Sequence, residues 1–111
     1  MIEKTILDYL NENASVKCYM ERPEGKPAKY ILIEKTGSTR SNLIDQSTIA
    51  VQSYAPSLFQ AAELNNEVKE LMYMLPELDE VSKVSLNSDY NFTNPADKQY
   101  RYQAVFVVTH Y

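Results

Sequence analysis

The sequence feature that most constrains the fold is a strand followed at once by a long amphipathic helix. Apolar β-branched residues alternate with small or polar ones over Thr48–Ala55, which is typical of a half-buried strand. Pro56 cannot donate to a sheet ladder, so this strand ends there. Ser57 is a favourable N-cap, and it predicts a helix that runs to Leu75, directly ahead of Pro76.

Apolar residues in this helix recur at steps of three and four, which predicts one apolar stripe and one polar face. The stripe consists of Ala61, Leu64, Val68, Leu71, Met72 and Leu75. The polar face consists of Glu63, Asn65, Asn66, Glu67, Lys69 and Glu70. A helix of this length spans roughly 28 Å at 1.5 Å per residue. The rest of the chain must therefore supply a sheet, and we expect Leu64, Val68 and Leu71 to be buried against it.

The remaining chain predicts a second helix and four more strands. Spaced apolar residues indicate a helix over Ile2–Asn13. The further strands are predicted at Val16–Glu21, Tyr30–Thr36, Val81–Phe92 and Gln99–His110. Short turns favour antiparallel pairing of neighbouring strands. The element order is α-β-β-β-α-β-β, and each helix has a single apolar stripe. We therefore predict an α+β fold, with an antiparallel or mixed sheet and two helices packed on one face.

Size and composition indicate one domain over residues 1–111. The apolar fraction of 44% is ordinary for a globular protein, and the single cysteine excludes an internal disulfide. No apolar run is long enough to span a bilayer, so we expect no membrane association. The net charge is −4 and the isoelectric point about 4.9, which argues against electrostatic binding of nucleic acid.

The sequence contains no recognisable catalytic or metal-binding motif. Cys18 and His110 are the only residues of their kinds, and nothing in the sequence brings them together with an orienting partner. A zinc site fails because one Cys and one His leave only carboxylates as further ligands. We therefore expect a protein that is not an enzyme and binds no cofactor or metal. We expect Cys18 to be a buried apolar residue, and His110 to lie in a fraying C-terminus.

One polar stretch, Thr36–Gln46, is longer than a typical hairpin loop. We interpret it as the least structured part of the chain, and long ordered loops are commonly functional. Its small polar residues surround one cation, Arg40, which could pair with a carboxylate on the long helix of a neighbouring subunit. The residues predicted to form a subunit or partner interface are Thr36, Gly37, Ser38, Thr39, Arg40, Ser41, Asn42 and Asp45. The alternative is a mobile, solvated surface loop.

Three motifs follow one another along the chain in a recognisable order. They are Glu34-Lys35-Thr36-Gly37, then Ala50-Val51-Gln52-Ser53-Tyr54-Ala55, then Ala61-Ala62-Glu63-Leu64. A Tyr-x-Phe-x-x-Pro segment at Tyr90–Pro95 and a Tyr-Arg-Tyr-Gln segment at Tyr100–Gln103 come after them. This order, over nearly the whole chain, resembles the tail terminator and head-to-tail joining proteins of long-tailed (siphovirus-like) bacteriophages and prophages.

The resemblance implies a structural, non-enzymatic role in virion assembly. Proteins of this kind form a ring, commonly a hexamer, at the head-proximal end of the tail tube, where the ring ends tube polymerisation and joins tail to head. The partners implied are further copies of the chain, the tail tube protein and a head-completion or connector protein. DNA passes through the ring without specific binding. The implied location is the virion, and the bacterial cytoplasm during assembly.

The residues taken alone leave a second function open. A small-molecule-binding or regulatory α+β module, with its ligand between sheet and helices, is compatible with the same elements, because one fold hosts many functions.

Overall fold

The computed structural model describes residues 1–25, 27–96 and 99–111. Its elements are α1 (Ile2–Asn13), β1 (Cys18–Tyr19), β2 (Tyr30–Ser41), β3 (Ile44–Ala55), α2 (Leu58–Tyr73), η1 (Leu75–Glu77), β4 (Val81–Asn91) and β5 (Tyr100–His110). This confirms the predicted α+β class and the order α-β-β-β-α-β-β. The short 3₁₀ helix η1 follows α2, around the proline that was expected to end the long helix.

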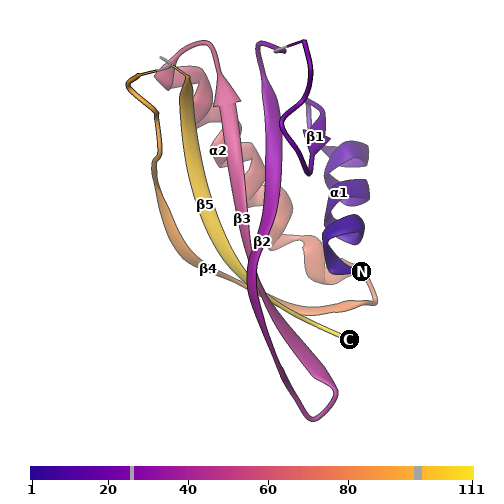
Figure 1. Cartoon of the computed structure of the whole chain (residues 1–111). Coiled ribbons are helices and arrows are strands. Elements are labelled where there is room, and N and C mark those ends of the chain that lie inside the picture. The colour runs from indigo at the N-terminus through magenta and orange to yellow at the C-terminus, as the bar shows by residue number, and fades with distance from the viewer. Residues whose placement is uncertain (26, 97–98) are drawn as a thin grey trace.

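The strands form one mixed sheet in the order β1-β2-β3-β5-β4 (Figure 1). β2–β3, β3–β5 and β4–β5 are antiparallel, as predicted, but β1 is parallel to β2. The expectation of antiparallel neighbours was wrong there because β2 starts at the same end of the sheet as β1, with Cys18 level with Ile31 and Tyr19 level with Leu32, so the two strands are not the arms of a tight hairpin. α2 carries the chain from the middle of the sheet to its β4 edge, and β5 then fills the place between β3 and β4.

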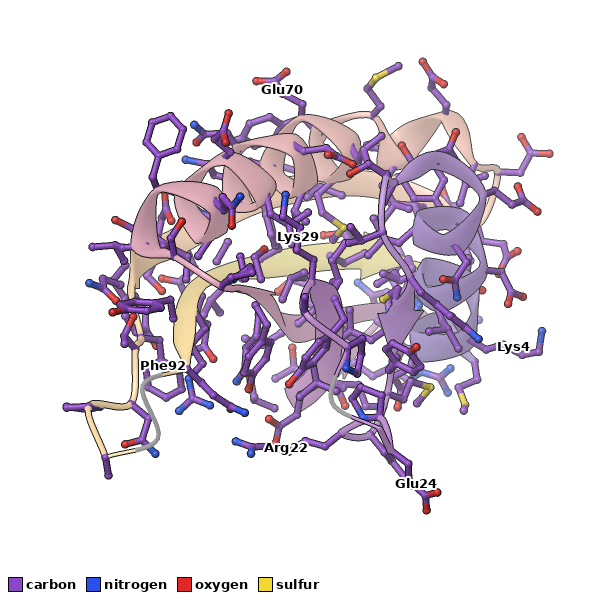
Figure 2. All side chains as sticks on the ribbon, turned by 90° about the horizontal axis from the view of Figure 1, so that it is seen from above. Lys4, Arg22, Glu24, Lys29, Glu70 and Phe92 are labelled. Carbon is purple, nitrogen blue, oxygen red and sulfur yellow. The ribbon has the colours of Figure 1, made fainter. Side chains whose placement is uncertain are left out.

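Both helices pack on one face of the sheet, and the core lies between the two layers. Figure 2, seen from above, shows α2 lying over the strands, with Glu70 directed away from them and with Arg22 and Glu24 on the opposite side of the molecule. The largest fully buried apolar side chains come from both helices, η1 and the central strands: Ile6, Leu10, Ile31, Ile49, Val51, Val68, Met72, Leu75, Phe106 and Val108.

The long helix follows its predicted boundaries closely. Ser57 caps it, since its hydroxyl accepts a hydrogen bond from the backbone N–H of Gln60 at 3.2 Å. Leu64 and Val68 are buried as predicted, whereas Leu71 is only half-buried at the edge of the core. The assignment of Asn65 to the polar face was wrong, because its side chain is only 2% exposed and faces the sheet.

The polar stretch Thr36–Gln46 is not a loop, so that interpretation was also wrong. β2 and β3 continue through it in register from Gly37↔Thr48 to Ser41↔Ile44, and only the two residues Asn42 and Leu43 turn. Threonine favours strands, and the hydroxyl-rich composition concealed that preference. The end of this hairpin extends past both helices and both chain termini (Figure 1). We call residues 36–46 the ribbon.

The last two strands also differ from expectation in one place. The strand predicted over Val81–Phe92 has a register shift between Leu86 and Ser88, where β4 bulges against β5. His110, expected to fray, is instead the last residue of β5, opposite Asp45 of β3, and is 8% exposed. It is ordered because the chain end pairs with strands on both sides.

Candidate interaction surfaces

The structure brings the predicted interface residues together on the ribbon. Residues 36–42 are all exposed, and Asp45 is half-buried. Alternate side chains of the two strands point to opposite faces, so the small hydroxyl groups are presented on both sides of a narrow strand pair. Such an arrangement leaves both faces of the strand pair open to solvent.

Arg40 has a carboxylate partner within its own chain. Its Nε donates to Asp45 Oδ1 at 2.8 Å and its Nη2 to Asp45 Oδ2 at 3.3 Å, in a forked arrangement across the ribbon. The hydrogen bond from Arg40 lowers the pKa of Asp45. This pair joins the two strands near the tip. The guanidinium group of Arg40, which we expected to pair with a carboxylate of a neighbouring subunit, is thus already bound to Asp45 of its own chain.

Sequence reasoning overlooked the tip of the ribbon. Leu43 is 80% exposed and Ile44 is 40% exposed, so the end of the hairpin is apolar although its sides are polar. Both turn residues have a positive φ, 52° for Asn42 and 66° for Leu43. The signal was present in the sequence as two consecutive aliphatic residues inside an otherwise polar stretch.

A buried polar pair lies at the base of the ribbon. The Ser47 hydroxyl and the His110 Nε2 are hydrogen-bonded at 2.8 Å, and Ser47 is only 1% exposed. Asp45 is opposite His110 in the sheet, but its carboxylate is occupied by Arg40. A serine without access to solvent cannot attack a substrate, so this pair joins β3 and β5 and does not form a catalytic centre.

The two residues weighed as a nucleophile and base lie far apart. Cys18 pairs with Ile31, which is level with Ser53, while His110 is level with Asp45, eight residues away along β3. At about 3.3 Å per residue this is roughly 26 Å. Burial raises the pKa of the Cys18 thiol to about 12, which makes it unreactive at neutral pH. Within residues 1–25, 27–96 and 99–111 no cluster of three or more His, Cys, Asp or Glu side chains could hold a metal ion.

The sheet face away from the helices carries a chain of interstrand hydrogen bonds. Gln52 Nε2 donates to Gln103 Oε1 at 2.8 Å, and Gln103 Nε2 donates to the Tyr90 hydroxyl. The Tyr54 hydroxyl donates to Gln52 Oε1 at 2.7 Å and accepts from Arg101 at 2.8 Å. These bonds satisfy the polar groups of Gln52, Tyr54 and Gln103, which are each less than one-tenth exposed. They hold the sheet together and leave few polar groups free for a ligand.

A shallow cleft of about 220 Å³ lies at the end of the sheet opposite the ribbon. Its walls include Pro27, Tyr30, Tyr54, Pro56 and Tyr100. The rings of Tyr30 and Tyr54 stack with centroids 4.4 Å apart, which gives the cleft one stiff aromatic wall. Gln99 also lines it, and its buried Oε1 accepts no hydrogen bond from any residue that the structure describes.

Charge is divided between the two layers. The helices together with the turn that follows η1, residues 2–13 and 58–80, carry nine acidic and two basic side chains, a net charge of −7. The five strands carry three acidic and four basic side chains, a net charge of +1. The outer surface of the helical layer is therefore the acidic side of the molecule.

The fold and these surfaces define a small α+β domain with a projecting β-ribbon. No protein-family model matches the chain, and no curated protein matches it either. Among the described residues, no helix is long and apolar enough to cross a membrane.

Proposed function

We propose that this chain is the subunit of a ring at the head-proximal end of a phage tail tube, where it ends tube polymerisation and joins the tail to the head. The role comes from the sequence resemblance, and the projecting ribbon is the structural observation that supports it best. Residues 36–42 are exposed, and the hairpin to which they belong ends beyond both helices, so the core does not require its tip. A preformed strand pair that projects from a domain is well suited to contact a second protein chain.

The charge distribution supports the same role. An acidic helical layer repels phosphate groups, so it can face a channel through which DNA passes without binding it. A hexamer of the chain would carry a formal net charge of −24, six times −4. Neighbouring copies of the chain, the tube protein and the head connector would then be bound through other surfaces, with the ribbon as the first candidate.

The small-molecule alternative has weaker support. Two clefts could take its ligand. The cleft beside Tyr30 and Tyr54 is shallow and has one unpartnered polar atom within the described residues. A second cleft, of about 280 Å³ beside α2, is more polar, but its Glu67 carboxylate already accepts hydrogen bonds from the N–H and hydroxyl of Ser15. Ligand sites usually orient their ligand with several convergent polar groups. We therefore retain the ring subunit as the proposed function.

Complementation of a phage or prophage that lacks this gene tests the proposal. In one variant the residues Arg40–Asp45 are replaced by Asn-Gly, which closes a two-residue turn between the paired residues Thr39 and Gln46. In a second, Arg40→Glu puts a like charge opposite Asp45 and disrupts the ribbon. Lys83→Glu, the same charge change at an exposed site on β4, is the matched control.

We expect the wild type and Lys83→Glu to yield joined, infectious particles. Both ribbon variants should accumulate separate heads and tails, visible by negative-stain electron microscopy, while the purified variant proteins remain folded. Normal titres of infectious particles with both ribbon variants would refute the role assigned to the ribbon.

A further inference from the structure

The tip of the ribbon carries an apolar side chain at a backbone position that disfavours it. Asn42 and Leu43 both lie in the left-handed region, with φ of 52° and 66°. Two-residue hairpin turns of this kind favour Asn-Gly, because only glycine occupies the second position without steric strain. Leu43 is nevertheless 80% exposed, so packing within the described chain does not explain a leucine there.

The neighbouring side chain strengthens this observation. Ile44 is 40% exposed, and together with Leu43 it ends a ribbon whose other residues are mostly polar. A backbone held in a sparsely populated conformation at an exposed site points to a function that requires the side chain. Anchor residues at protein interfaces are large side chains that insert into a pocket of the partner. An exposed leucine at the tip of a projecting hairpin is positioned for such a contact.

The same chain also contains a cleft that matches the Leu43 side chain in apolar character. The cleft beside Tyr30 and Tyr54 has aromatic and proline walls, and its volume of about 220 Å³ is large enough for a leucine side chain. Gln99 also lines this cleft, but its Oε1 is buried beneath the surface and is not exposed to a second molecule. The tip and the cleft therefore match in apolar character and in size.

The tip cannot reach the cleft of its own molecule. β3 begins beside the tip at Ile44 and ends at the cleft with Ala55, eleven residues further on. At about 3.3 Å per residue this separation is roughly 36 Å. The longest dimension of the molecule is 44 Å, so the two surfaces lie near opposite ends.

We propose that Leu43 of one copy inserts into the Tyr30–Tyr54 cleft of the next copy. Because the two surfaces are different, the contact is head-to-tail, and each bound copy presents a further tip and a further cleft. Such a contact closes into a ring when the rotation between copies allows it. This inference rests on the proposed ring and names the contact that would build it.

Sedimentation velocity on purified protein tests the contact first. Leu43→Gly and Leu43→Ala both remove the anchor, and we expect each to weaken self-association by about tenfold or more. Both variants should stay folded by circular dichroism, because the side chain is 80% exposed in the monomer. Met74→Ala removes another apolar side chain, one that is 50% exposed outside both surfaces, and should associate like the wild type.

Disulfide trapping tests the geometry. Leu43→Cys and Ala28→Cys, the latter at the exposed rim of the cleft, are prepared as separate proteins and mixed under mild oxidation. We expect a covalent heterodimer from this mixture. A mixture of Leu43→Cys with Met74→Cys is the control and should give only background. The native Cys18 is buried and does not compete.

The outcomes separate this contact from the ring itself. Self-association of the wild type that persists in Leu43→Gly, or that gives no 43–28 heterodimer, would overturn the contact and leave the ring proposal standing. A wild-type chain that stays monomeric up to about 1 mM would also overturn the contact, since it needs only two copies. The complementation experiment, which measures the joining of heads and tails, then tests the role of the ring separately.

Discussion

The hydroxyl of Ser47 on β3 and the Nε2 of His110 on β5 lie 2.8 Å apart inside the sheet, at the base of the ribbon. Ser47 is 1% exposed and His110 is 8% exposed, so water does not replace either partner. This hydrogen bond fixes the chain end against the strand that leads into the ribbon. The direction of the ribbon thus depends on a buried polar contact as well as on backbone pairing.

Removal of this contact should cost stability. Ser47→Ala leaves the buried His110 nitrogen without its partner, which should lower the free energy of unfolding by about 1–3 kcal/mol. Ser41→Ala, an exposed serine on the same ribbon, should change it by no more than about 0.5 kcal/mol. Urea unfolding followed by circular dichroism measures both. Equal stabilities for the two variants would show that the buried hydrogen bond contributes nothing measurable.

Alanine substitutions along α2 should destabilise the protein according to how deeply each side chain is buried. Met72 is fully buried, so Met72→Ala should cost about 2–5 kcal/mol of unfolding free energy. Leu71 is only half-buried, and Leu71→Ala should cost roughly 1–2 kcal/mol. Thermal unfolding compares the pair directly. A larger loss for Leu71→Ala than for Met72→Ala would mean that the orientation of α2 is wrong.

The strained tip makes an unusual stability prediction. Leu43→Gly relieves about 1–2 kcal/mol of left-handed strain, against roughly 0.5–1 kcal/mol for the greater freedom of glycine in the unfolded chain. We therefore expect a gain of roughly 0.5–1 kcal/mol in the monomer. Leu43→Ala keeps a Cβ at the same φ and should bring no gain. If alanine stabilises the monomer as much as glycine does, strain is not the cause.

The thiol of Cys18 should be protected in the native state. Its pKa is raised to about 12 by burial, from an ordinary value of 9.0. At pH 8, alkylation should be about a thousandfold slower in the folded protein than in denaturant, because the thiolate fraction falls tenfold per pKa unit. Rapid alkylation of the native protein would contradict this burial.

The same raised pKa gives the sign of a pH effect. A neutral thiol is favoured in the folded state, so its stabilising contribution is complete below pH 9 and is lost as the pH rises toward 12. Cys18→Ala removes this contribution, and its stability should fall less steeply over the alkaline range than that of the wild type. Identical slopes for the two proteins would rule out the coupling.

Local sequence signals were enough to predict most of the architecture. The apolar stripe of α2, its cap at Ser57 and the stop at Pro56 are determined by neighbouring residues, and the structure follows them closely. The two-layer arrangement follows because a helix with one apolar stripe needs a sheet to cover it. The burial of Cys18 in a short strand was also predictable from its apolar neighbours.

Features that depend on distant partners could not be predicted in the same way. Asn65 is polar yet buried, because Asp89 on β4 accepts its hydrogen bond at 2.7 Å. His110 is ordered because it is hydrogen-bonded to Ser47 and because β5 pairs with a strand on each side. The ribbon was missed because a turn without glycine, at Asn42 and Leu43, gives no strong hairpin signal.

We propose that the chain assembles through its ribbon, and native mass spectrometry measures this assembly. The wild type and the variant with Asn-Gly in place of Arg40–Asp45 are measured over the same concentration range, alone and mixed with the tail tube protein. We predict a closed multimer, with six copies as the expected number, for the wild type and monomers for the shortened ribbon. The same distribution of species for both proteins under both conditions would contradict assembly through the ribbon.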